Sequence, residues 1–240
     1  MITSKQNKQV EYAKKLADKK GRRESGEFLI EGAKLVADAF AHGLDVTRVF
    51  VTPEHGKTYP CETLAVSEAV MKSLCDAETN QGVAATAKIP ASKPYDKKSA
   101  LVLDRIQDPK NLGSILRTAM GAGINTVFLL NCADAFSPKA LRAGMSGQFA
   151  INLIATDAEV LKQLTAGMQI ISADMGGENV FTFKAEKDFV LILGNEGGGI
   201  SEELKALSAH TVSVPMKNNL ESLNVAVSAG IIMYQITSNK

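Results

Sequence analysis

The sequence is poor in the residues that build metal sites and disulfide frameworks. Of its 240 residues, three are cysteines and three are histidines. No two cysteines form a C-x-x-C pair, and the histidines stand apart from them and from one another. We therefore expect no metal site and no disulfide scaffold. A few unpaired cysteines are typical of a reducing compartment, so we expect a cytoplasmic protein.

Long hydrophobic runs are also missing. No apolar stretch reaches the roughly 18 residues that a membrane span needs. The polar, basic opening Met1–Gln6 lacks the apolar centre of a secretory signal. Apolar residues nevertheless make up 45% of the chain and charged residues 22%, as in ordinary globular proteins with a sizeable core. The expectation is a globular protein without a membrane segment.

A strong net charge is absent as well, since the formal charge is +1. The chain as a whole is therefore not attracted to nucleic acid, but its cations are unevenly placed. Residues 1–23 contain eight basic side chains, namely Lys5, Lys8, Lys14, Lys15, Lys19, Lys20, Arg22 and Arg23. Such a run forms either a solvated helix face or an arm that contacts phosphates, and composition does not choose between them.

The spacing of apolar residues predicts a small α/β unit in the first ninety residues. Its expected helices span 5–20, 34–40 and 66–75, and its expected strands span 28–30, 46–51 and 83–87. The segment 89–98 has two prolines, three lysines and no periodicity, which is typical of a linker. We assign residues 1–90 to a small domain, 91–98 to the linker and 99–240 to a larger domain.

Strands and helices alternate more regularly in the larger domain. The expected strands span 100–103, 126–130, 150–154, 169–173, 189–193 and 211–214, and the expected helices 112–121, 138–145, 157–165, 201–207 and 222–237. Such alternation indicates an α/β fold with a parallel or mostly parallel sheet flanked by helices. Ligands of such sheets bind at the carboxyl ends of the strands, so the loops at that edge are the first place to look for a site.

The first of these loops follows the strand that ends at Asp104 and enters a helix at Asn111, which we expect to be the helix cap. Gly113 lowers the helix propensity without an obvious structural gain. It therefore indicates close approach by another backbone or by a ligand. Arg117 lies six residues, nearly two turns, after Asn111 on the same expected helix.

Two further loops complete the set. Gly194–Ser201 follows a buried strand and contains four glycines and Glu196. Val214–Met216 ends another strand and leads through Glu221, Ser222 and Asn224 into an apolar helix, whose free N–H groups attract polar ligand atoms. The glycine spacing is not G-x-G-x-x-G, and no Gly-Lys-Ser/Thr follows, which counts against dinucleotide and P-loop sites.

Together the three loops resemble the motifs of the SpoU (TrmH-type) RNA 2′-O-ribose methyltransferases, which belong to the SPOUT superfamily. The matching residues, in the family's order and spacing, are Asn111 with Arg117, then Gly194-Asn195-Glu196-Gly197, then Val214-Pro215-Met216 followed by Glu221-Ser222-Leu223-Asn224-Val225-Ala226. The resemblance runs from about residue 98 to the end. The segment 26–32 is similar, more briefly, to the substrate-binding domain of the family members that act on ribosomal RNA.

The resemblance implies an enzyme that methylates a ribose 2′-hydroxyl of structured RNA with S-adenosylmethionine, with ribosomal RNA favoured as the substrate. It also implies a C-terminal trefoil knot that forms the cofactor pocket, a homodimer, and RNA binding by the small domain. The residues that would surround the cofactor are Gly194, Glu196, Val214, Met216 and Leu223. The residues that would form the catalytic cluster are Arg117, Asn111, Glu196, Ser222 and Asn224.

The family's arginine, which Arg117 matches, is proposed to activate the 2′-hydroxyl. A guanidinium stays protonated in proteins, so we expect Arg117 to anchor the adjacent phosphate and stabilise the developing alkoxide instead of removing the proton. Glu196 would neutralise and align this arginine. Arg142, in a loosely matching region, either contacts an RNA phosphate or forms a surface salt bridge.

Three alternatives stay open from the sequence. A tRNA 2′-O-methyltransferase shares the same motifs. A non-catalytic RNA-binding protein that retains the fold is disfavoured by the complete set of polar residues. A dehydrogenase-like nucleotide enzyme is disfavoured by the missing G-x-G-x-x-G after the first strand of the larger domain.

Overall fold

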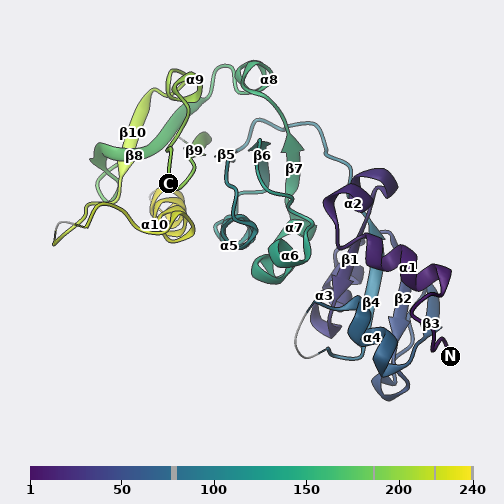
Figure 1. The fold of residues 1–240 in the computed structure, drawn as a ribbon. Helices are drawn as coiled ribbons and strands as arrows, with labels where there is room; N and C mark the ends of the chain where they lie inside the picture. Colours follow the sequence, from purple (N-terminus) through teal and green to yellow (C-terminus); the bar gives the residue numbers. More distant parts are fainter. Residues whose placement is uncertain (77–79, 186, 219, 239–240) are drawn as a thin grey trace.

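The computed structural model describes residues 1–76, 80–185, 187–218 and 220–238, and within them the chain forms two β-sheets (Figure 1). The first has four strands in the order β1-β4-β2-β3, and the second has six in the order β10-β8-β9-β5-β6-β7. Among the described helices none is long and apolar enough to span a membrane.

The four-stranded sheet is mixed, because β4 pairs antiparallel with β1 and β2 whereas β3 is parallel to β2. The elements of this part are α1 (Lys8–Lys15), α2 (Lys19–Ser25), β1 (Glu27–Glu31), α3 (Ala33–Ala41), β2 (Val46–Val51), a 3-10 turn (Pro53–His55), β3 (Glu62–Ala65), α4 (Glu68–Leu74) and β4 (Val83–Lys88). The single helix predicted over 5–20 is wrong. The chain turns after α1, and the backbone of Gly21 then packs too closely on the Lys15 carbonyl to leave room for a side chain.

The six-stranded sheet is parallel at every pairing, which confirms the predicted sheet type. Its elements are β5 (Ala100–Asp104), α5 (Pro109–Gly121), β6 (Thr126–Leu130), α6 (Pro138–Gly144), α7 (Gly147–Ala150), β7 (Asn152–Ala155), α8 (Ala158–Leu164), β8 (Gln169–Asn179), β9 (Phe189–Leu193), α9 (Glu202–Lys205), β10 (His210–Ser213) and α10 (Val225–Ser238). The strand β8 is longer than predicted and carries an irregularity where it pairs with β10.

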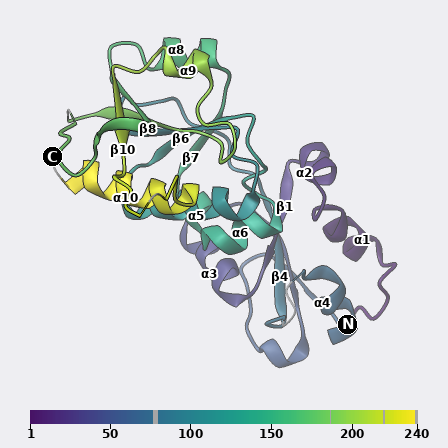
Figure 2. The ribbon, with the colours of Figure 1, turned by 60° about the vertical axis from the view of Figure 1, so that its left-hand side comes forward.

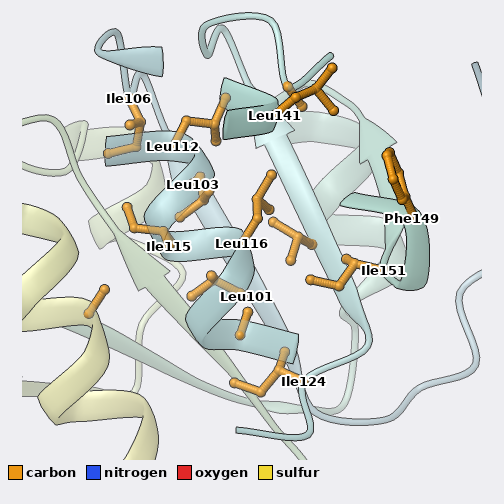
Figure 3. Packing of buried hydrophobic residues seen from close by; sticks show 14 of the residues in the cluster. Leu101, Leu103, Ile106, Leu112, Ile115, Leu116, Ile124, Leu141, Phe149 and Ile151 are labelled. Carbon is orange, nitrogen blue, oxygen red and sulfur yellow. The ribbon is translucent and has the colours of Figure 1, made fainter. Parts of the chain in front are cut away.

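Helices cover both faces of this sheet, with α5, α6 and α10 on one side and α8 and α9 on the other (Figure 2). Every residue of β5 and β9 is buried, which explains the uninterrupted apolar sequence of β9 and of β5 up to Asp104. Leu101 and Leu103 pack with the side chains of α5 and α10 (Figure 3), whereas Ala100 and Val102 pack with those of α8 and α9. The alternation along β5 therefore joins both helical layers to one central strand.

The helices α5 and α6 lie in backbone contact at Gly113. A Cβ atom there would lie 2.9 Å from the Gly144 nitrogen and still closer to the carbonyl oxygen of Ala140. This confirms that Gly113 marks the close approach of another backbone, and the partner is α6.

The two sheets share one hydrophobic cluster, which includes side chains of β1 and α3 as well as of β5 and α5. The Phe28 ring lies 4.8 Å from that of Phe136, centre to centre. Arg22, only 3% exposed, pairs with Asp134 at 2.8 Å. This member of the basic N-terminal run is therefore a buried structural cation.

Candidate active site

Loops that follow β5, β9 and β10 meet in a chain of hydrogen bonds at the carboxyl edge of the large sheet. The side-chain amide of Asn111, on α5, donates to Oε1 of Glu196 at 2.6 Å. The amide of Asn224 donates to Oδ1 of Asn111 at 3.1 Å. Three motifs that are far apart in the sequence are thus joined directly.

The start of α10 fixes the donor-to-acceptor direction of this chain of hydrogen bonds. Oδ1 of Asn224 accepts from the backbone N–H groups of Ala226 and Val227, as a helix cap does. The NH₂ group of Asn224 must then face Asn111, whose own NH₂ group must face the Glu196 carboxylate. Both amides are therefore oriented, with a helix N-terminus at one end of the chain and a carboxylate at the other.

The predicted capping role of Asn111 is wrong. The helix α5 begins at Pro109, three residues before the predicted start at residue 112, because Asp108 accepts from the Lys110 N–H and Pro109 occupies the first helical position, where a proline is well tolerated. With the cap supplied by Asp108, the Asn111 side chain is available for Glu196. The predicted start of the last helix at Ser222 is also too early, since α10 begins at Val225.

Arg117 projects from α5 as an exposed side chain, and in the described part of the protein it makes no hydrogen bond or ion pair. Its charge is therefore available to a ligand. The expected alignment of Arg117 by Glu196 is not present as a direct contact, since Glu196 is bound to Asn111. Ser222 is also exposed and makes no side-chain hydrogen bond to another described residue.

The glycine loop after β9 is closed on itself. Asn195 and Gly199 exchange two backbone hydrogen bonds, of 2.9 and 3.0 Å. Oδ1 of Asn195 accepts from the N–H groups of Gly197 and Gly198. A side chain at Gly194 would overlap the backbone of Gly199, so this position can only be glycine without moving the loop.

Two residues that the sequence reasoning missed hold this loop against β5. Asp104 is buried and accepts from the Ser201 N–H at 2.7 Å and from Arg105 at 3.0 and 3.1 Å. Arg105, in the left-handed region at φ 58°, donates to the Gly199 carbonyl and accepts from the Asn195 amide through its own carbonyl. The sequence signal for these residues is an acidic residue at the end of an apolar strand, because a buried carboxylate needs hydrogen-bond or charge partners.

The third motif offers a surface suited to a purine. Val214, Met216 and Leu223 are half-buried, and their backbone N–H and C=O groups make no hydrogen bond to another described residue. An adenine ring has apolar faces and a donor–acceptor edge, so half-buried apolar side chains with free backbone groups fit an adenosine-containing cofactor. In the described chain no group of three or more His, Cys, Asp or Glu residues is arranged to hold a metal ion.

A parallel α/β sheet with a polar cluster and a glycine loop at its carboxyl edge defines a ligand-binding α/β protein of the enzyme type. Residues 98–234 match the SpoU rRNA Methylase family, and the chain belongs to this family. Residues 7–85 match the MRM3-like substrate binding domain. The family predicted from the three motifs is thus confirmed.

The chain is similar over nearly its whole length to proteins named as rRNA or SpoU methyltransferases. It is 34% identical to the 23S rRNA (guanosine(2553)-2′-O)-methyltransferase RlmP of Bacillus subtilis, over 98% of each chain. An AdoMet-bound rRNA methyltransferase from Sinorhizobium meliloti superposes with a TM-score of 0.88 at 29% identity, over 98% of this chain and 95% of that one. The SpoU methyltransferase AviRb from Streptomyces viridochromogenes, in complex with AdoMet, superposes with a TM-score of 0.87 at 25% identity, over 97% and 98% of the two chains.

Proposed function

We propose that the protein transfers the methyl group of S-adenosylmethionine to a ribose 2′-hydroxyl of ribosomal RNA. The observation that carries this proposal is the chain of hydrogen bonds from Glu196 through Asn111 to Asn224, which joins all three family motifs. Family membership and the AdoMet complexes of similar structures support the cofactor. The joined cluster also argues against a non-catalytic RNA-binding protein.

Ribosomal RNA is favoured over transfer RNA by the length of the similarity. RlmP, whose name states 23S rRNA, aligns over 98% of this chain. A structure described by 2′-OH methylation of tRNA aligns over only 58% of it. The small domain is therefore shared with an rRNA-modifying relative.

When bound, S-adenosylmethionine supplies an activated methyl group together with its leaving group. The protein must position the ribose oxygen and stabilise the charge that develops as the hydroxyl loses its proton. Arg117 is suited to this, because its guanidinium is exposed and unpaired within the described chain and is able to bind the neighbouring phosphate. Asn111, on the same helix, binds the Glu196 carboxylate, and these two residues complete the proposed polar cluster together with Asn224. Ser222 borders the ribose.

The cofactor is assigned to the backbone of the glycine loop and of the third motif. Gly194 and Glu196 would lie on one side of it and Val214, Met216 and Leu223 on the other. The tight loop closure at Gly194 and the free backbone groups of the third motif support this assignment. The proposal includes the trefoil knot characteristic of the family, formed by the chain after β9.

A homodimer is proposed from the surface of α5 and α10. The last helix is apolar on most of its circumference, yet Val227 and Tyr234 are 51% and 50% exposed. Met120 on the neighbouring α5 is 39% exposed. Exposed apolar side chains on two packed helices are typical of a surface that a second copy covers.

The proposed domains are an RNA-binding domain over 1–90, a linker over 91–98 and a catalytic domain over 99–240. The absence of helix and strand between β4 and β5, all of it described, supports this division. The cytoplasm is proposed as the compartment, in keeping with the three free thiols Cys61, Cys75 and Cys132.

The decisive experiment compares ribose methylation of ribosomal and transfer RNA from cells with and without the gene, mapped by primer extension. One rRNA stop should disappear with the gene and return with the wild-type protein. The purified Arg117→Ala protein should bind S-adenosylmethionine with wild-type affinity in calorimetry and show no turnover. Arg117→Lys should retain a small part of the wild-type turnover. An unchanged rRNA pattern, or full turnover by Arg117→Ala, would overturn the proposal.

A further inference from the structure

The turn between α6 and α7 has an unusual backbone. Met145 and Ser146, which are consecutive, both lie in the left-handed region, at φ 44° and 71°. Side chains other than glycine, asparagine and aspartate rarely adopt this region, and two in succession persist only where the surroundings hold them. Ser146 is 6% exposed, so the strained residue is buried.

The surroundings that hold this turn come from the small domain. The Ser146 hydroxyl donates to Oδ2 of Asp38, on α3, at 2.8 Å. Asp38 also pairs with Lys34 at 2.7 Å. Burial raises the pKa of Asp38, but the hydrogen bonds from Lys34 and Ser146 outweigh this effect and place the pKa below its ordinary value. The acceptor is therefore a carboxylate at neutral pH.

The other side of the turn supports the backbone of Arg117. A Cβ atom on Gly147 would lie 2.9 Å from Cα of Arg117 and 3.0 Å from its nitrogen. The side chain of the next residue, the buried Gln148, donates to the carbonyls of Ala135 and Ala140. These bonds fix α7 against the neighbouring loop and α6 within the larger domain. Ser146 and Gly147 are adjacent, so this turn connects α3 of the small domain to the backbone of α5 at Arg117.

We propose that Ser146 is a positioning residue for Arg117, held in its left-handed conformation by the carboxylate of Asp38. The inference rests on the proposed function, in which Arg117 binds the RNA phosphate. The docking of the small domain against the catalytic domain then sets the position of the arginine. A free catalytic domain lacks this restraint and loses turnover even when its cofactor site is intact.

Ser146→Ala is the informative variant, because alanine loses only the hydroxyl and keeps a side chain in the left-handed region, where it then has no partner in Asp38. It should lower kcat about tenfold or more, with the affinity for S-adenosylmethionine unchanged by calorimetry. Asp38→Ala should have the same effect, and the double variant should be no worse than either single one. Asp38→Asn, which keeps an acceptor oxygen, should recover part of the rate.

The matched control is Asp45→Ala, which removes a small-domain aspartate that also pairs with a lysine, Lys88, at 2.7 Å. Its kcat should equal that of the wild type. Wild-type kcat in both Ser146→Ala and Asp38→Ala would overturn the inference, as would additive losses in the double variant. Arg117→Ala in the same assay separates the two proposals. Full activity of Arg117→Ala refutes the role of Arg117, whereas its inactivity beside a fully active Ser146→Ala refutes only the role of Ser146.

Discussion

Replacing Gly113 by alanine should destabilise the protein, although alanine is ordinarily the better helix residue by about 1 kcal/mol. The added Cβ atom would lie 2.9 Å from the backbone nitrogen of Gly144 and nearer still to the carbonyl oxygen of Ala140. These are backbone atoms of α6 and cannot rotate away. The helices α5 and α6 would therefore have to separate.

The size of the effect follows from two opposing contributions. Overpacking of a well-packed contact costs about 1–3 kcal/mol, and the gain in helix propensity offsets about 1 kcal/mol of it. The difference is a net loss of up to about 2 kcal/mol, which in a chain of this length lowers Tm by up to about 8 °C. The value should lie at the upper end, because the clash is with backbone and not with a movable side chain.

Gly121→Ala, at the end of the same helix, provides the control. The nearest atom to its Cβ would be the hydroxyl oxygen of Tyr234 at 2.8 Å, the tip of an exposed side chain that is free to move. This variant should be neutral or raise the stability by up to about 1 kcal/mol. Differential scanning calorimetry of both variants decides the matter: an equal rise of Tm in Gly113→Ala would refute the packing argument.

Other variants and conditions test the remaining contacts. Arg105→Ala should weaken the binding of S-adenosylmethionine about tenfold by calorimetry, because the glycine loop loses its link to β5; unchanged affinity would contradict this role. Asn224→Ala should lower the free energy of unfolding by about 1 kcal/mol in urea, because α10 loses its cap. Burial raises the pKa of the Cys132 thiol from 9.0 to about 11, so at pH 8 it should react with iodoacetamide far more slowly than the unfolded chain. As the pH rises from about 9 to 11 the unfolded chain releases this proton first, so stability should fall over that interval.

The sequence predicted the elements of the large sheet well because their signals are local. The strands over 126–130 and 189–193 have the predicted bounds, since each is a short apolar run between turn residues. The four-residue helix α7 was missed, because it is too short to show periodicity. The exposed strand β3, over 62–65, was missed because it has little apolar pattern.

In the candidate site, too, features within a local motif could be predicted from the sequence, whereas contacts between distant strands could not. The residues Asn111, Glu196 and Asn224 could be proposed from the sequence because each lies in a recognisable local motif, and the structure joins them by hydrogen bonds. The hydrogen-bond partners of Asp104 and Arg105 could not be predicted, because they depend on β5 lying beside β9. Pairing between such distant strands is decided by the whole fold, and no local spacing encodes it.

The pairing of β5 with β9 also sets the order in which the chain can fold during synthesis. Val102 lies opposite Ile192, so most of the protein must leave the ribosome before the middle of the large sheet is complete. At about 5–20 residues per second, β5 waits roughly 5–20 s for its neighbour. The small sheet, by contrast, closes within residues 27–88. A nascent chain therefore carries a closed small sheet beside an open apolar strand, which makes protection by a chaperone most valuable in that interval.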